Sequence, residues 1–222
     1  SEDAMVEWVY SVANAVDTEG TDRTFVGADG NTHTLGAGKS GGEAYGWSVD
    51  SDALLENVKE GIQTNFTGQM SIPTISDAYT WTAPGAPDWG AHAEVSISQQ
   101  HAWYFDAAGN LLWEADVVTG APTAKRATPT GIWRIYKHET NYTLTGDVLP
   151  STGEPAYRTR VAFWMPFTYT GCGFHDATWQ PGFGGERYKN GYGSHGCVNL
   201  SYGDAEALFD IISIGDAVLV YD

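Results

Sequence analysis

From about residue 91 onward, the chain is a series of short apolar or alternating segments separated by turn residues. The run AEVSISQQHAWYFDAAGNLLWEADVVTG predicts three strands, with a turn at Ala108-Gly109-Asn110. Further strands are predicted in TPTGIWRIYKHE, in RTRVAFWMPFTYTGCGFHDATW and in the closing AVLVYD. The one clear helix covers SYGDAEALFDII, with Ser201 and Asp204 as a capping box. Many strands with one late helix indicate a β-rich sandwich or barrel.

The first 90 residues have a different pattern. Helical spacing of apolar residues predicts a helix over residues 4–16, and the turn signal Asp29-Gly30 predicts a hairpin. A second helix is expected to begin with Ser51 as its cap and to carry Leu54, Leu55, Val58 and Ile62. Residues 71–90, which are rich in Pro, Gly and Ser, predict an extended strand followed by a linker. We therefore expect a small α+β domain over residues 1–90 and a β-rich domain over residues 91–222.

Composition excludes several classes of function. The 222-residue chain is 42% hydrophobic and 13% aromatic, which is enough for a packed core. Its formal net charge of −17 repels nucleic acid and anionic lipid, so neither is expected as a partner. No apolar run reaches the length of about 20 residues that spans a bilayer, and no signal peptide is visible. We expect that the sequence has been cut from a longer protein.

The stretch GSHGCVNL, residues 193–200, contains Cys197, one of two cysteines in the chain. A buried inert thiol is one interpretation, but the surrounding Gly and Ser describe a turn, and turns lie at surfaces. A disulfide with Cys172 is a second interpretation, which spacing does not decide. A metal site formed with His175, Asp176 and His195 is a third, but this spacing matches no zinc signature.

The fourth interpretation of Cys197 is a nucleophile. A cysteine nucleophile needs a base for its proton, a group that orients the base, and N–H donors for the oxyanion. The glycine turn offers such donors, since Gly196 allows the backbone to approach a substrate closely. His175 and His195 are both candidates for the base, and spacing does not rank them.

The motifs TPTGIW, GFHDATW and GSHGCVNL, in this order, resemble the L,D-transpeptidase catalytic domain of the YkuD-like family, over roughly residues 91–222. The resemblance implies a β-sandwich with one main helix, in which Cys197 is the nucleophile and His175 the general base. It implies that Ser194 and His195 shape the pocket and orient the base. Gly196 and Cys197 would provide the oxyanion amides, and no metal or cofactor is required.

The same resemblance implies a set of substrate contacts. Tyr157 matches a lid tyrosine, Thr170 and Gly171 match a strand that contacts the donor peptide, and Asn199 holds a position that is Arg in many relatives. Asp176 is expected either to be solvated or to tune His175 electrostatically, and we include it among the substrate-binding candidates. Alternation along the strand places Cys172 on the face opposite His175, as an inert thiol.

The implied function is a peptidoglycan L,D-transpeptidase that cross-links third-position stem residues through a cysteine thioester and is a target of some β-lactams. Its partners would be a tetrapeptide donor stem and an amine acceptor stem. We would expect such a protein outside a Gram-positive cell, at the wall, on a membrane anchor that lies outside this sequence. The alternatives are an L,D-carboxypeptidase or endopeptidase that uses the same acyl-enzyme, and a wall-binding protein without catalysis.

The N-terminal part carries a second resemblance. The segment from Arg23 to Ile62, with its Tyr45-Gly46-Trp47 run leading into a helix, is similar to the later portion of an α+β peptidoglycan-binding module. This resemblance implies a partial wall-binding module, and a packing spacer is the alternative.

Overall fold

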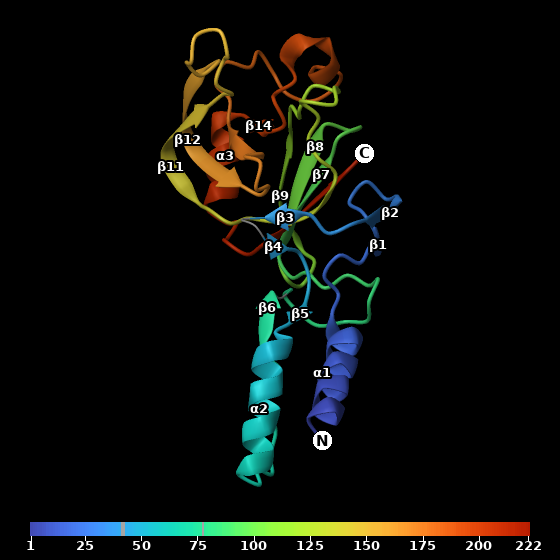
Figure 1. Cartoon of the computed structure of the whole chain (residues 1–222). Helices are drawn as coiled ribbons and strands as arrows, with labels where there is room; N and C mark the ends of the chain where they lie inside the picture. The colour runs from blue at the N-terminus through green and yellow to red at the C-terminus, as the bar shows by residue number, and fades with distance from the viewer. Residues whose placement is uncertain (41–42, 77) are drawn as a thin grey trace.

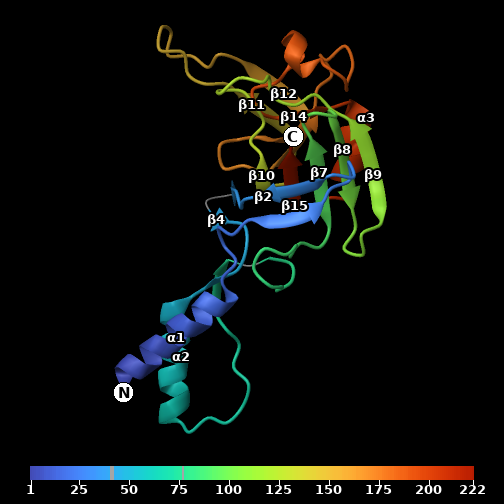
Figure 2. The same ribbon diagram turned by 90° about the vertical axis from the view of Figure 1, so that its right-hand side faces the viewer.

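The computed structural model describes residues 1–40, 43–76 and 78–222 of the chain. Figures 1 and 2 show a β-rich body, with a pair of helices projecting from one end. Gly41 and Gly42, in the segment that resembles a wall-binding module, and Asp77, in the predicted strand and linker of residues 71–90, lie outside the described residues. The helices are α1 (Glu2–Val16), α2 (Ser51–Gln63) and α3 (Tyr202–Phe209), and η1 (Tyr188–Tyr192) is a π-helical turn.

Two sheets form the body. The first has the strand order β10-β15-β7-β8-β9 and is antiparallel except for the β15–β7 pair. The second has the order β11-β12-β13-β14, in which β13 and β14 are parallel. The first sheet consists of β7 (His92–Ser96), β8 (His101–Phe105), β9 (Leu111–Asp116), β10 (Gly131–Arg134) and β15 (Ala217–Tyr221). The second consists of β11 (Glu139–Thr145), β12 (Arg158–Pro166), β13 (Gly173–Asp176) and β14 (Val198–Leu200).

Apolar residues from both sheets and from α3 meet in one core. Val95 of β7, Phe174 of β13 and Leu208 of α3 are each 0% exposed within this cluster. Burial of one such side chain stabilises the fold by about 1.5–3 kcal/mol before entropy is counted. The predicted β-rich fold with one main helix is confirmed, because residues 91–222, all of which are described, contain α3 as their one α-helix.

The segment that follows β9 joins the two sheets. Val118 forms a bridge with Asn199 beside β14, and Gly120 forms a bridge with Ser194. The same chain therefore leaves the edge of the first sheet and pairs with the turn before β14. This crossing places the GSHGCVNL turn at the junction of the sheets.

The N-terminal part contains the predicted hairpin and both predicted helices. Its strands are β1 (Arg23–Val26), β2 (Thr32–Leu35), β3 (Lys39–Ser40), β4 (Glu43–Ala44), β5 (Ser48–Val49) and β6 (Thr74–Ser76). One detail of the sequence prediction for α2 is wrong. Asp50, whose carboxylate accepts the N–H of Ala53, is the cap instead of Ser51. Ile62 is largely exposed and lies outside the apolar cluster in which Leu54, Leu55 and Val58 pack with residues of α1.

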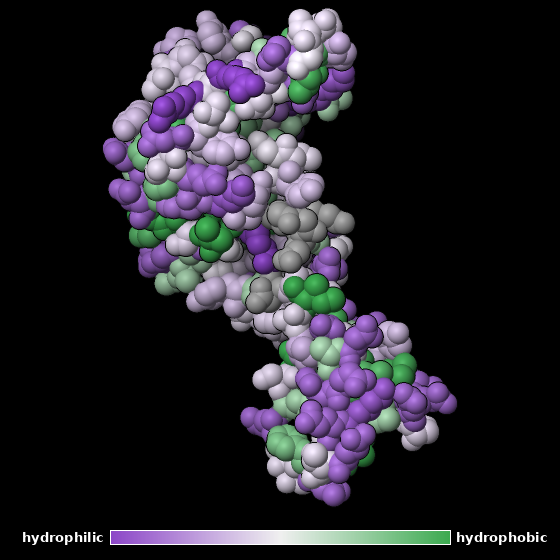
Figure 3. All heavy atoms as spheres, turned by 60° about the vertical axis from the view of Figure 1, so that its left-hand side comes forward, coloured by the Kyte–Doolittle hydropathy of each residue, from purple (hydrophilic) through white to green (hydrophobic). Residues whose placement is uncertain are grey.

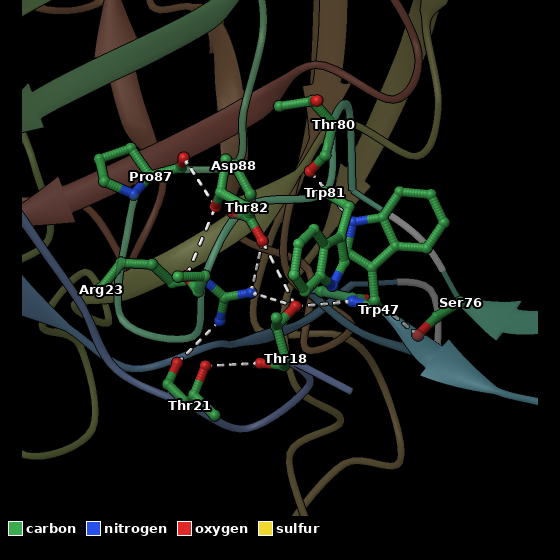
Figure 4. Close-up of polar contacts among 12 residues, drawn as sticks. Thr18, Thr21, Arg23, Trp47, Ser76, Thr80, Trp81, Thr82, Pro87 and Asp88 are labelled. Carbon is green, nitrogen blue, oxygen red and sulfur yellow. Dashed lines mark hydrogen bonds and ion pairs between the residues drawn. The ribbon is translucent and has the colours of Figure 1, made fainter. Parts of the chain in front are cut away.

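Parts of residues 17–40, 43–50 and 78–90 pack onto the first sheet. Phe25, Leu35 and Tyr45 form a second apolar cluster with residues of β10 and β15, and the backbone of residues 36–38 exchanges hydrogen bonds with Ile132. Figure 4 shows the buried ion pair that closes this junction: Arg23 Nη2 lies 2.8 Å from Asp88 Oδ2. The segment before residue 91, predicted as a linker, is therefore fixed against the body.

The surface in view is largely hydrophilic. On the face shown in Figure 3, hydrophilic residues cover much of the body and of the helical pair, and hydrophobic residues form small scattered patches. Within the described part of the chain, no helix is both long enough and apolar enough to cross a membrane.

Candidate active site

A cleft of about 310 Å³ lies beside the Cys197 turn. Its walls come from three regions far apart in the sequence: the β11–β12 hairpin, the end of β13 with the residues after it, and the segment from η1 to β14. The lining residues are Leu144, Tyr157, Thr159, His175, Trp179, Gln180, Gly191, Tyr192, Gly193, Ser194, His195, Cys197 and Asn199. The cleft thus brings together six of the ten predicted site residues.

Strand pairing explains why His175 and Cys197 share this cleft. His175 of β13 lies opposite Asn199 of β14 in the parallel ladder. Cys197 precedes Asn199 by two residues, so both side chains lie on one face of the extended chain, the face that carries His175. All three residues line the cleft.

The orientation of His175 is fixed by the backbone. Its Nδ1 lies 2.8 Å from the carbonyl oxygen of Asp176. A carbonyl can only accept, so Nδ1 carries the proton and Nε2 keeps its lone pair. The ring lies between Trp164 and Trp179, with ring centroids 5.9 and 5.8 Å away. Burial lowers the pKa of His175, so the imidazole is neutral at pH 7 and can accept a proton at Nε2.

Cys197 is a protonated thiol at neutral pH. Burial, and secondarily the neighbouring Cys172 thiol, raise the pKa of Cys197 to about 12, while a hydrogen bond with the Gly173 backbone opposes this rise. The thiol donates weakly to the carbonyl of Gly171, at 3.6 Å. At neutral pH the cleft therefore holds a neutral thiol and a neutral imidazole.

Ser194 braces the turn around Cys197. Its hydroxyl donates to the carbonyl of Cys197 at 2.6 Å and accepts the N–H of Gly196 at 3.0 Å. The sequence interpretation assigned Ser194 to orienting the base, but its described hydrogen bonds go to the backbone of its own turn and to Thr119 and Ala121. The Gly196 amide, predicted as an oxyanion donor, is occupied by Ser194 in this structure.

Tyr157 and His195 form one wall of the cleft. Their ring centroids lie 5.2 Å apart. Tyr157 also covers Gly146, since an added Cβ at Gly146 would lie 2.5 Å from its ring. The hairpin formed by β11 and β12 therefore reaches the Cys197 turn through the Tyr157 ring.

Four predicted residues lie outside the cleft lining. Thr170 and Gly171 are exposed on the turn before β13, although the Gly171 carbonyl faces the Cys197 thiol. The Asp176 carboxylate is buried and accepts the backbone N–H groups of Ala162 and Phe163, at 2.7 and 3.0 Å. Asp176 is thus not solvated; it contacts His175 through its carbonyl and holds β12 through its side chain. Gly196, the fourth, is buried beneath the turn.

Cys172 lies directly behind the turn. A Cβ added at Gly196 would be 2.6 Å from Cys172 Sγ, and both thiols are free. Burial raises the pKa of Cys172, as expected for an inert thiol. In the described ranges, no three His, Cys, Asp or Glu side chains are grouped so that they could hold a metal ion.

Sequence reasoning missed several residues of the site. Gln180 and Tyr192, from the glycine-rich run between the two motifs, line the cleft, and so do Leu144 and Thr159 of the hairpin. The position of that run between His175 and Cys197 was the available signal. Asn199 carries a further feature: its Oδ1 is buried and has no hydrogen-bond partner among the described residues.

Comparisons with known proteins identify the family. The model of the YkuD family, described as the L,D-transpeptidase catalytic domain, matches residues 90–220. L,D-transpeptidase 2 of Mycobacterium tuberculosis is 35% identical over 112 residues, which are 47% of this chain and 26% of that protein. L,D-transpeptidase 1 of the same organism is 27% identical over 194 residues, 78% of this chain and 74% of that protein. The chain thus spans about a quarter of the first relative and about three quarters of the second.

Solved structures extend the likeness to the whole chain. An Enterococcus faecium L,D-transpeptidase, solved as a cysteine-to-serine mutant, is 28% identical with a TM-score of 0.77, over 100% of this chain and 82% of that one. The Ldtfm–avibactam carbamoyl enzyme gives 28% identity and a TM-score of 0.78, over 100% and 81%. One solved relative is an Enterococcus faecium catalytic domain acylated by ertapenem, and another is a carbamoyl enzyme formed with avibactam. Since the family model covers more than half of its residues, the chain belongs to the YkuD family of L,D-transpeptidase catalytic domains.

Proposed function

We propose that the chain is a peptidoglycan L,D-transpeptidase that forms cross-links through a thioester on Cys197, with His175 as general base. The observation that carries this proposal is the shared cleft of Cys197 and His175, with the imidazole held as the Nδ1–H tautomer. This tautomer leaves the lone pair of Nε2 available to accept a thiol proton. Ion-pair activation is not needed, because base-assisted attack starts from the neutral pair.

The chemistry proceeds in two steps. In the first, Nε2 of His175 takes the thiol proton, and Cys197 Sγ attacks the carbonyl of the third-position residue of a tetrapeptide stem. The C–N bond to the terminal D-residue breaks, and the departing amine receives the proton from His175. In the second step His175 takes a proton from the amine of another stem, that nitrogen attacks the thioester, and the C–S bond breaks. The Cys197 sulfur regains its proton, so one amide is exchanged for another.

The unpaired oxygen of Asn199 is consistent with a peptide substrate that donates a hydrogen bond. Its buried Oδ1 lacks a partner among the described residues and belongs to a residue of the cleft wall. A buried acceptor left unpaired costs about 1–3 kcal/mol, which a donor N–H from a bound stem peptide would recover. Tyr157 and His195 would cover the bound stem as a lid, and Thr170 and Gly171 would contact its backbone beyond the cleft.

The setting of this activity is also part of the proposal. An enzyme that acts on peptidoglycan would lie outside the cell, at the wall. It would be held there by a membrane anchor that lies outside this sequence. We assign residues 91–222 to catalysis and residues 1–90 to a partial wall-binding module. The similarity of the solved Enterococcus faecium relative over the whole chain supports a shared role for both parts.

The test is a mass spectrum of the products formed from purified disaccharide-tetrapeptide by the chain and by Cys197→Ala. A dimer that has lost one terminal D-residue, absent with the variant, is expected. A tripeptide monomer as the sole product would replace transpeptidation with carboxypeptidase activity. Unchanged substrate with both proteins would refute catalysis by this chain and favour a wall-binding protein.

A further inference from the structure

The turn that carries Cys197 is held from behind by a residue to which no role has been given. Thr128 lies in the loop between β9 and β10 and is 3% exposed. Its hydroxyl donates to the carbonyl of Gly196 at 2.9 Å and accepts the N–H of Gly120 at 2.9 Å. The hydroxyl thus uses both its hydrogen and one lone pair in hydrogen bonds. These two bonds link Gly120 to Gly196, the residue before the nucleophile.

The bond to Gly196 sets the orientation of a whole peptide unit. A trans peptide is planar, with its C=O and N–H on opposite sides. The carbonyl of Gly196 and the N–H of Cys197 belong to the same unit, and the carbonyl points at Thr128. The N–H of Cys197 therefore points away from Thr128, and it belongs to a residue that lines the cleft.

This orientation matters because the other candidate donor is engaged. The Gly196 amide is hydrogen-bonded to Ser194. The N–H of Cys197 has no hydrogen-bond partner among the described residues. Gly196 also has a φ of +126°, a conformation with little intrinsic preference, so an external contact is needed to hold its peptide in place.

The loop that carries Thr128 is built for this close approach. A Cβ at Gly120 would lie 1.9 Å from the carbonyl oxygen of Arg126 and 2.7 Å from the nitrogen of Thr128, so the loop backbone rests directly on Gly120. Buried Gln100 fixes the residue before it, because its Oε1 accepts the N–H of Thr119 at 3.0 Å. Thr128 thus projects from a loop whose backbone packs against Gly120, and the preceding residue, Thr119, is held by Gln100.

We infer that Thr128 is a positioning residue for the acylation of Cys197: its hydroxyl orients the Gly196–Cys197 peptide so that the Cys197 N–H stabilises the developing oxyanion. The inference rests on the proposed cysteine acyl-enzyme. It assigns Thr128 no contact with substrate. The hydroxyl acts in the transition state, when negative charge develops on the attacked oxygen, and leaves ground-state binding unchanged.

The test compares Thr128→Val, which keeps the shape and removes the hydroxyl, with Thr128→Ser, which keeps the hydroxyl. Acylation by a carbapenem is followed by intact mass over a range of inhibitor concentrations, which separates the limiting rate from the concentration of half-saturation. In Thr128→Val we expect the limiting rate to fall about 10–100-fold, part of the loss seen when an oxyanion donor is removed outright, with half-saturation changed less than threefold. Thr128→Ser should stay within about threefold of the wild-type rate.

Thr18→Val is the control for stability. Thr18 is equally buried and its hydroxyl accepts the N–H of Trp47, far from the cleft. This variant should lose stability and acylate at the wild-type rate. If Thr128→Val unfolds, Thr128→Ala replaces it as the hydroxyl-free variant, with the same expected ratio to Thr128→Ser.

Two results would overturn the inference: a hydroxyl-free variant that acylates at the wild-type rate, or a Thr128→Ser variant as slow as Thr128→Val. The outcome for the proposed function is read separately. If the wild-type chain is not acylated, or if Cys197→Ala is acylated equally, the cysteine acyl-enzyme fails and the role of Thr128 fails with it.

Discussion

The protonation state of Cys197 leads to a quantitative prediction for its reaction with a small alkylating agent. With the pKa of Cys197 raised to about 12, about one thiol in 10⁵ is ionised at pH 7, against about 3% for an unperturbed cysteine. The thiolate of a more basic thiol is the better nucleophile. Across this difference in pKa, its intrinsic reactivity is higher by a factor of about 40. Alkylation of Cys197 by iodoacetamide should therefore be about a hundredfold slower than that of an exposed thiol at pH 7.

The pH profile distinguishes this mechanism from an ion pair. Alkylation of Cys197, followed by peptide mapping to separate it from Cys172, should rise about tenfold per pH unit from pH 6 to pH 10 without a plateau. Acylation by a carbapenem should behave differently, because His175 removes the proton in the bound complex. It should rise through the lowered pKa of His175, below 6.5, and stay level to about pH 8.

Alkylation that is already fast and constant between pH 5 and pH 7 would refute this reasoning, since it would show a thiolate beside an imidazolium at rest. Cys197→Ala, in which only Cys172 can react, provides the background rate.

Burial of neutral His175 also makes the stability of the protein depend on pH. The unfolded chain takes up a proton near pH 6.5 that the folded chain does not, so the free energy of unfolding should decrease as the pH falls below 6.5.

Three further perturbations follow from the contacts. Asp88→Ala leaves Arg23 charged and buried, so urea unfolding should show a loss of about 3–5 kcal/mol, while acylation of the folded fraction keeps its rate; a loss below 1 kcal/mol would contradict this. Gly196→Ala places a Cβ 2.6 Å from Cys172 Sγ at a φ of +126°, so acylation should fall below detection and the melting temperature should drop; wild-type kinetics would show that the turn is not constrained. Tyr157→Ala removes the ring that contacts His195 and should raise KM for tetrapeptide several-fold, whereas Tyr157→Phe keeps the ring and should match wild type; equal KM values for both would remove Tyr157 from the lid.

Local patterns in the sequence were enough for the fold class and for the main elements. Strand alternation, the Asp29-Gly30 turn and the Ser201 cap are features of neighbouring residues, and each appears where expected. The cap of α2 shifted by one residue because Asp50 and Ser51 are both good caps, and the sequence does not show which of them faces the first free N–H groups.

The site was predictable to the extent that a motif names residue types. The motif paired Cys197 with His175, but it could not show that Ser194 occupies the Gly196 amide or that Asp176 turns its carboxylate to β12. Those outcomes depend on contacts between segments far apart in the chain. The contact between Thr128 and Gly196 joins residues 68 positions apart; the TPTGIW motif includes Thr128 but does not show which group its hydroxyl contacts.

The pairing of residues 36–38 with β10 has a consequence for dissection of the protein. β10 is the outermost strand of the first sheet, and Ala37 bridges Ile132 along that border. A chain that starts at residue 91 would present β10 as an unprotected edge, with free backbone donors and acceptors beside a buried isoleucine. Such an edge recruits strands from other molecules. If the shortened protein self-associates as its concentration rises, the cause would be the loss of residues 36–38 from the edge of β10. Such association would not by itself reveal a native dimer.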